Sequence, residues 1–161
     1  MLLFFIISVS AAAADWAVTA APVSFFPAGK HMPEGLYAQA GIRAALHPRF
    51  EAELLVIPRI TPEPFSHAAA GAMAGFNLLA DLEEAYFHMI ADIGMLCRFD
   101  FRTQEKDPLV YVRISPLSIG NPDYRYRERI FTAGLLYDIQ NQTFSWTFST
   151  WIQDWFVSRF Q

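Results

Sequence analysis

Ten charged or histidine side chains recur at alternate positions in the sequence, and their types and spacing could do chemistry. They are Arg43, Glu51, Glu53, Arg59, His88, Asp92, Arg98, Asp100, Arg102 and Arg113. A guanidinium can bind a carboxylate through two parallel hydrogen bonds, so arginines and acids on one face predict an ion-pair network in a confined space. Arginine outnumbers lysine by ten to two, which favours such a network over a solvated face.

Catalysis is the alternative use of these residues. His67, His88 and Asp92 could form a His–Asp pair in which the carboxylate orients a general base. However, no serine stands in a nucleophile-elbow setting, the predicted connections are short, and the four histidines lack metal-site spacing. We therefore expect no enzyme activity, metal or cofactor, and we interpret these side chains as a hydrogen-bonded interior. For a membrane enzyme acting on lipid or peptide, His67 and Asp92 would be the first alanine variants.

Two other chemical features have simpler interpretations. The run 124–129 (YRYRER) could bind lipid phosphates, carbohydrate or an anionic partner, or it could be a solvated strand extension at a membrane interface. The net charge of −4 and the lack of a lysine and arginine cluster argue against nucleic acid. Cys97 is the one cysteine, so an intrachain disulfide is excluded, and we interpret it as a small apolar side chain on a strand face.

The elements that would position these residues are strands, because apolar and polar residues alternate with a period of two. Strands are expected at 17–26, 36–47, 50–59, 65–79, 87–102, 109–115, 129–139 and from 143 to the end of the chain. Residues 116–123 are expected to form a loop. In the last strand, Phe144, Ile152 and Phe156 are expected on the apolar face. Pro22 would need a bulge or an edge position, since it cannot donate to the ladder.

The composition indicates that one face of the predicted strands contacts an apolar solvent. Of the residues, 53% are hydrophobic and 17% are charged, against about 25% charged in soluble domains. No stretch after residue 14 reaches the roughly 18 apolar residues of a membrane helix. We therefore predict an all-β, antiparallel, up-and-down transmembrane β-barrel of about eight strands, whose four tryptophans mark aromatic belts. Eight strands leave room for side chains alone, which predicts a filled lumen and no wide pore.

The alternative is a soluble periplasmic barrel that binds an apolar ligand. The N-terminal sequence favours export, because residues 2–9 (LLFFIISV) are apolar and Ala11 to Ala14 end in an Ala-x-Ala pattern. We expect a signal peptide at 1–14 and a barrel domain at 15–161, placed in a bacterial outer membrane.

The last seven residues, WFVSRFQ, resemble the aromatic C-terminal strand that barrel-assembly machinery recognises, although they end in Gln161 after Phe160. Over 15–161 the chain resembles the small eight-stranded outer-membrane barrels of the OmpA/OmpX type. Residues 113–121 and 129–138 are also similar to uncharacterised spirochaetal barrels. The resemblance implies a structural or surface-interaction role at the cell surface, with the lipid bilayer and the assembly machinery as partners.

Overall fold

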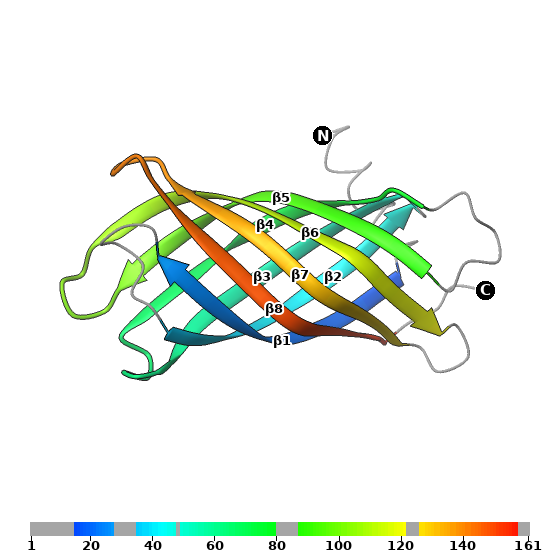
Figure 1. Cartoon of the computed structure of the whole chain (residues 1–161), viewed down its shortest axis with the longest axis horizontal. Helices are drawn as coiled ribbons and strands as arrows, with labels where there is room; N and C mark the ends of the chain where they lie inside the picture. The colour runs from blue at the N-terminus through cyan, green and yellow to red at the C-terminus, as the bar shows by residue number, and fades with distance from the viewer. Residues whose placement is uncertain (1–14, 28–34, 48, 80–86, 122–125, 158–161) are drawn as a thin grey trace, which may run out of the picture.

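The chain forms a closed barrel of eight antiparallel strands, each paired with its neighbours in sequence, and β1 closes the barrel on β8 (Figure 1). The computed structural model describes residues 15–27, 35–47, 49–79, 87–121 and 126–157. The strands are β1 (Asp15–Pro27), β2 (Gly35–His47), β3 (Phe50–Thr61), β4 (His67–Asn77), β5 (Phe87–Asp100), β6 (Lys106–Asn121), β7 (Tyr126–Asp138) and β8 (Thr143–Phe156). The predicted all-β barrel of eight strands is therefore confirmed.

The barrel has two ends, called here the terminal end and the distal end. At the terminal end, β1 begins beside the end of β8, since Ala17 pairs with Phe156. The strand ends at residues 47, 50, 77, 87, 121 and 126 lie at the same end. The strand ends at residues 27, 35, 61, 67, 100, 106, 138 and 143 lie at the opposite, distal end. Among the described residues, no helix is long and apolar enough to cross a membrane. The predicted signal peptide, 1–14, lies outside the described residues.

Alternation along each strand sorts side chains to the two faces of the barrel wall. In β3, Glu51, Glu53 and Leu55 are buried inside the barrel, whereas Leu54 and Val56 are exposed outside. The same division holds around the barrel. The buried face carries arginines, acids, serines and threonines together with some apolar residues. On the outer wall between the two ends, the exposed large side chains are apolar.

A row of bulges interrupts this alternation across β6, β7 and β8. In each strand two consecutive residues face outward where regular alternation would give one: Pro116 and Leu117, Ile130 and Phe131, and Thr150 and Trp151. The register of β6 shifts against β5 between His88 and Ile90, and that of β8 shifts against β1 between Ala20 and Ser24. Each bulged strand therefore holds one residue more than β5 or β1 at this level.

The bulges correct several sequence predictions. Pro22 lies at the β1–β8 register shift, so of the two positions predicted for it, a bulge or an edge, the structure has the bulge. The loop predicted at 116–123 was wrong for its first six residues, because β6 continues past Pro116 to Asn121. Ile152 is 1% exposed and lies inside, not on the outer face, because the bulge at Thr150 reverses the faces of β8. The strand predicted from residue 65 begins at His67.

Candidate functional site

Eight charged side chains form one ion-pair network in the half of the barrel nearest the terminal end. All eight are buried, and they are Arg43, Glu51, Glu53, Asp92, Arg113, Arg127, Arg129 and Asp154. Four are arginines and four are acids, so their formal charges sum to zero. Charges buried away from water are tolerated when they are paired and hydrogen-bonded, and this network meets that condition.

The network crosses the interior of the barrel. Arg127 on β7 donates to both carboxylate oxygens of Glu51 on β3, at 2.6 and 2.9 Å. Four strand positions separate β3 from β7 around the wall, so this bidentate pair spans the lumen. The side chains of the two walls therefore meet inside the barrel at this level.

Asp92 on β5 is the centre of the network. Its Oδ1 accepts from Arg43 Nη2 at 2.7 Å, and its Oδ2 accepts from Arg113 Nε at 2.7 Å. Arg129 Nη1 approaches Oδ2 at 3.5 Å. One carboxylate thus serves three guanidinium groups from β2, β6 and β7.

Glu53 links the same arginines from the opposite side. Arg43 Nη1 donates to Glu53 Oε2 at 2.7 Å, and Arg113 Nη2 pairs with the same oxygen. Gln39 donates from Nε2 to Glu53 Oε1 and accepts from Arg113 Nη1, each at 3.0 Å. The amide therefore fills the hydrogen-bonding positions left between a glutamate and an arginine.

Asp154 on β8 organises the other half of the network. It accepts from Arg127 Nε at 3.0 Å and from Arg129 Nη2 at 2.9 Å. Thr19 on β1 donates to its Oδ1 at 2.8 Å. Arg43 and Glu51 pair across the turn between β2 and β3, which joins this half to the Asp92 half.

β4 contributes no charge to the network and leaves room for it. A Cβ atom at Gly75 would lie 2.5 Å from Asp92 Oδ1 and 2.7 Å from Arg43 Nη2. The Arg43–Asp92 pair therefore passes directly over the glycine backbone. A larger residue here would push the two charges apart.

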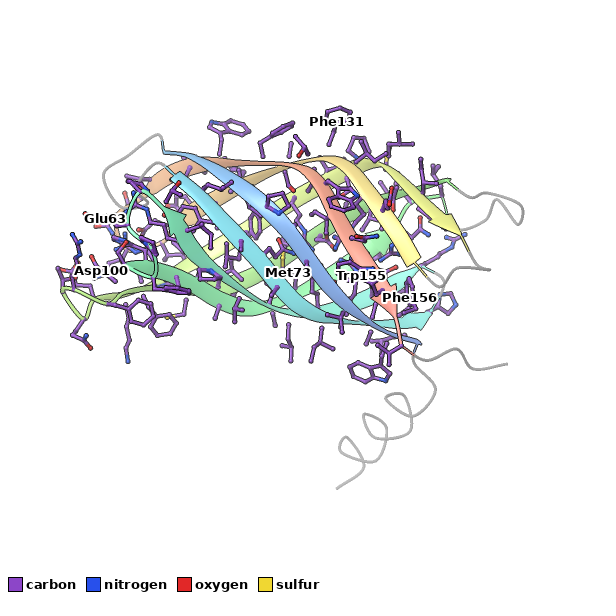
Figure 2. All side chains as sticks on the ribbon, turned by 90° about the horizontal axis from the view of Figure 1, so that it is seen from below. Glu63, Met73, Asp100, Phe131, Trp155 and Phe156 are labelled. Carbon is purple, nitrogen blue, oxygen red and sulfur yellow. The ribbon has the colours of Figure 1, made fainter. Side chains whose placement is uncertain are left out.

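An apolar layer fills the interior beyond the network, toward the distal end. Its buried side chains are Tyr37, Leu55, Ile57, Ala69, Met73, Leu96, Leu109, Tyr111 and Leu136. Figure 2 shows Met73 within the barrel, between the end that carries Glu63 and Asp100 and the end that carries Trp155 and Phe156. The inner face thus changes from charged to apolar along the axis.

The distal end carries a separate polar group. Arg98 is buried and pairs with Asp107 on β6. Arg59 is also buried, and its guanidinium donates to Thr61 O at 3.2 Å and to Ser66 Oγ at 3.3 Å. These two predicted lumen residues therefore lie inside the barrel but apart from the central network.

The remaining predicted lumen residues lie at the ends of the barrel. Arg102 is in the turn after β5, where its side chain is 63% exposed and pairs with Glu63 at 3.0 Å, so its assignment to the lumen was wrong. The prediction extended the strand alternation two residues beyond its end at Asp100. Asp100 caps this turn by accepting from the Arg102 amide at 2.9 Å. His88 is half-buried at the terminal end.

Ser66, His67 and Asp100 form a contact chain at the distal end. His67 Nδ1 lies 3.0 Å from Ser66 Oγ, and His67 Nε2 lies 3.3 Å from Asp100 Oδ2. However, the Ser66 hydroxyl donates to the Glu63 carbonyl at 2.8 Å, and Ser66 is buried. Its proton is therefore held by the turn, and this geometry favours a structural role over nucleophilic attack.

Sequence reasoning missed Arg127, Arg129 and Asp154. The first two belong to the run 124–129, which was interpreted as a surface feature, yet both are buried in the network. A constant alternation through β7 puts these arginines on the outer face, because the bulge at Phe131 is not visible in composition. Arg127 and Arg129 are two residues apart, so they lie on the same face of a strand. This spacing was the sequence signal that could have identified them.

Among the described residues, no group of three or more His, Cys, Asp or Glu side chains could hold a metal ion. The sequence matches no family model and no curated protein. The geometry alone therefore carries the functional argument.

Proposed function

We propose that the chain is a bacterial outer-membrane β-barrel protein with a structural or surface-interaction role. In this proposal the signal peptide directs export, barrel-assembly machinery inserts the chain, and lipid surrounds the outer face. The resemblance to OmpA/OmpX-type barrels, which was inferred from the sequence, is part of this proposal. The protein has no catalytic role in it.

One observation carries the proposal: the polarity of the barrel is reversed relative to a soluble barrel. A soluble barrel buries apolar residues inside and exposes polar ones. Here eight paired charges are buried inside, while the exposed large side chains in the middle of the wall are apolar and mostly aliphatic. They include Ile42, Leu54, Val56, Ile93, Met95, Val112 and Ile114. Such an outer surface is unfavourable in water and favourable in hydrocarbon.

Exposed aromatic side chains at both ends give further support. Trp16, Phe50, Phe76 and Trp155 lie toward the terminal end, and Phe65, Phe101, Phe144 and Trp146 toward the distal end. Aromatic girdles of this kind flank the apolar band of membrane barrels at the two water interfaces. Closure of the sheet also gives every strand two neighbours, which a bilayer requires of a spanning sheet.

The interior supports a filled lumen in place of a wide pore. The central network joins opposite walls, and the apolar layer lies between it and the polar group of the distal end. Ions would meet paired charges and then a layer of mainly apolar side chains. A surface role is therefore favoured over transport.

The test is membrane fractionation combined with gel migration of unheated and boiled samples. We expect the mature chain in the membrane fraction, with a compact form in mild detergent that migrates differently after boiling. In planar bilayers we expect no stable nanosiemens conductance steps. Recovery in the soluble fraction without detergent would overturn the membrane assignment, and stable steps would overturn the filled lumen. Covalent labelling of Ser66 by a fluorophosphonate, in which Oγ displaces fluoride from phosphorus, would overturn the non-catalytic role.

A further inference from the structure

Three inward-facing side chains form a row across β5, β6 and β7 near the terminal end. His88 is opposite Ser118, and Ser118 is opposite Arg129. Residues directly opposite on neighbouring strands have Cβ atoms about 5 Å apart. Ser118 and Arg129 are both 0% exposed. The three side chains therefore face the same part of the interior space of the barrel.

Two buried polar atoms in this row have no hydrogen-bond partner: the hydroxyl oxygen of Ser118 and Nε of Arg129. Arg129 uses Nη1 and Nη2 on Asp92 and Asp154, which leaves the Nε–H donor. Buried polar groups are hydrogen-bonded in most native proteins, so two unsatisfied atoms on adjacent strands mark a place where a ligand could bind. Hydroxyl and guanidinium both offer hydrogens to it.

His88 adds a third donor. Asn77 Oδ1 accepts from the Leu79 amide at 3.2 Å, so the amide nitrogen of Asn77 faces His88 Nδ1, at 2.8 Å. His88 Nδ1 then accepts, and the ring hydrogen of the neutral histidine resides on Nε2. Nε2 lies over Gly120, where a Cβ would be 3.3 Å away. The absence of a side chain at residue 120 thus lets the ring donor face the interior.

We propose that this space binds one small inorganic anion of halide size, held by Ser118 and Arg129 and reached from the terminal end past His88. All three groups can donate a hydrogen bond, and of the three only the hydroxyl can also accept one. An anion suits this set, whereas the two hydrogens of a water molecule would find one acceptor among them. The narrow interior of an eight-stranded barrel sets the size limit. This inference does not depend on the membrane assignment.

The test measures thermal unfolding of the folded full chain in detergent, with bromide or chloride replacing gluconate at constant ionic strength. We expect the midpoint to rise by about 2–4 °C and to saturate, because an anion that binds the folded state stabilises it by mass action. Ser118→Ala should remove this response. Ser118→Asp should place a carboxylate in the site and make the midpoint insensitive to halide.

The matched control is Ser115→Ala. Ser115 is also buried on β6, but its hydroxyl is paired with Thr132 at 2.7 Å, so this variant should keep the halide response. Anomalous diffraction from wild-type crystals grown in bromide should show a peak between Ser118 and Arg129, which tests the site even if a variant does not fold. A wild-type midpoint equal in halide and gluconate, or a Ser118→Ala variant that keeps the response, would overturn the proposal.

Discussion

At the scale of single residues, the barrel interior depends on the pairing of each charge. Asp92 pairs with more arginines than any other acid of the network, with Arg43 and Arg113 at 2.7 Å and Arg129 at 3.5 Å. Removing one partner of a buried ion pair leaves an uncompensated charge, which costs more than the intact pair contributes. The loss of stability on substitution is therefore set by the charges that the substitution leaves unpaired.

Asp92→Asn is expected to lower the free energy of unfolding by about 3 kcal/mol, because three arginines lose a shared carboxylate. Urea-induced unfolding in detergent micelles, followed by tryptophan fluorescence, measures this change. Arg113→Gln added to Asp92→Asn should restore part of the loss by removing one unpaired charge. Glu105→Gln, at an exposed acid, is the control and should change stability little. Equal stability of Asp92→Asn and the control would contradict the ion-pair account.

At the scale of elements, alternation made most of the strands predictable, and the bulges limited the prediction. In β3 and β5 the period of two continues along the strand, and the sequence placed Glu51, Glu53 and Asp92 on the inner face where the structure has them. In β7 and β8 one added residue reverses the faces, and no composition marks it. Arg129 was therefore missed and Ile152 misplaced. Ion pairs between side chains of distant strands, such as Glu51 on β3 with Arg127 on β7, also depend on barrel closure, and no local sequence pattern predicts them.

The bulge row gives a prediction for this scale. Deleting Phe131 alone should prevent folding, because β7 would lose one residue of register against both β6 and β8. Deleting Pro116, Phe131 and Thr150 together should restore the register among the three strands and recover part of the folded form. The compact band on an unheated gel measures folding. Phe131→Ala keeps the register and is the control. A single deletion that folds as wild type would show that the row does not set the register.

At the scale of the whole molecule, the outer surface is the feature that would distinguish the proposed membrane barrel from a soluble one. Figure 2 shows Phe131 projecting away from the barrel wall, as expected for a side chain in contact with an apolar solvent. It is 57% exposed, although it lies near the middle of the wall and away from both ends. Its ring lies beside that of Phe148, with the centroids 6.3 Å apart, yet more than half of its surface stays uncovered.

Cys97 provides a test at this scale, since it is the one cysteine of the sequence and lies on the outward side of β5. A fluorophore attached to it before folding into vesicles should be quenched by brominated acyl chains and not by aqueous iodide. The control moves the cysteine to the exposed distal turn, as Cys97→Ala with Thr103→Cys, where iodide should quench. Strong iodide quenching at Cys97 itself would show that this face is in water.

The charge pairing also bears on the order of assembly. Within the central network, the β2–β3 hairpin contributes Arg43 with Glu51 and Glu53, whose formal charges sum to −1, whereas β7 and β8 contribute Arg127 and Arg129 with Asp154, whose charges sum to +1. Asp92 and Arg113, which the β5–β6 hairpin contributes, sum to zero. Neither of the first two sets is neutral by itself, and the Arg127–Glu51 pair joins them across the interior. In the proposed membrane protein, an open sheet would leave these network charges unpaired at its two sides, and their attraction would favour closure before the chain enters an apolar phase.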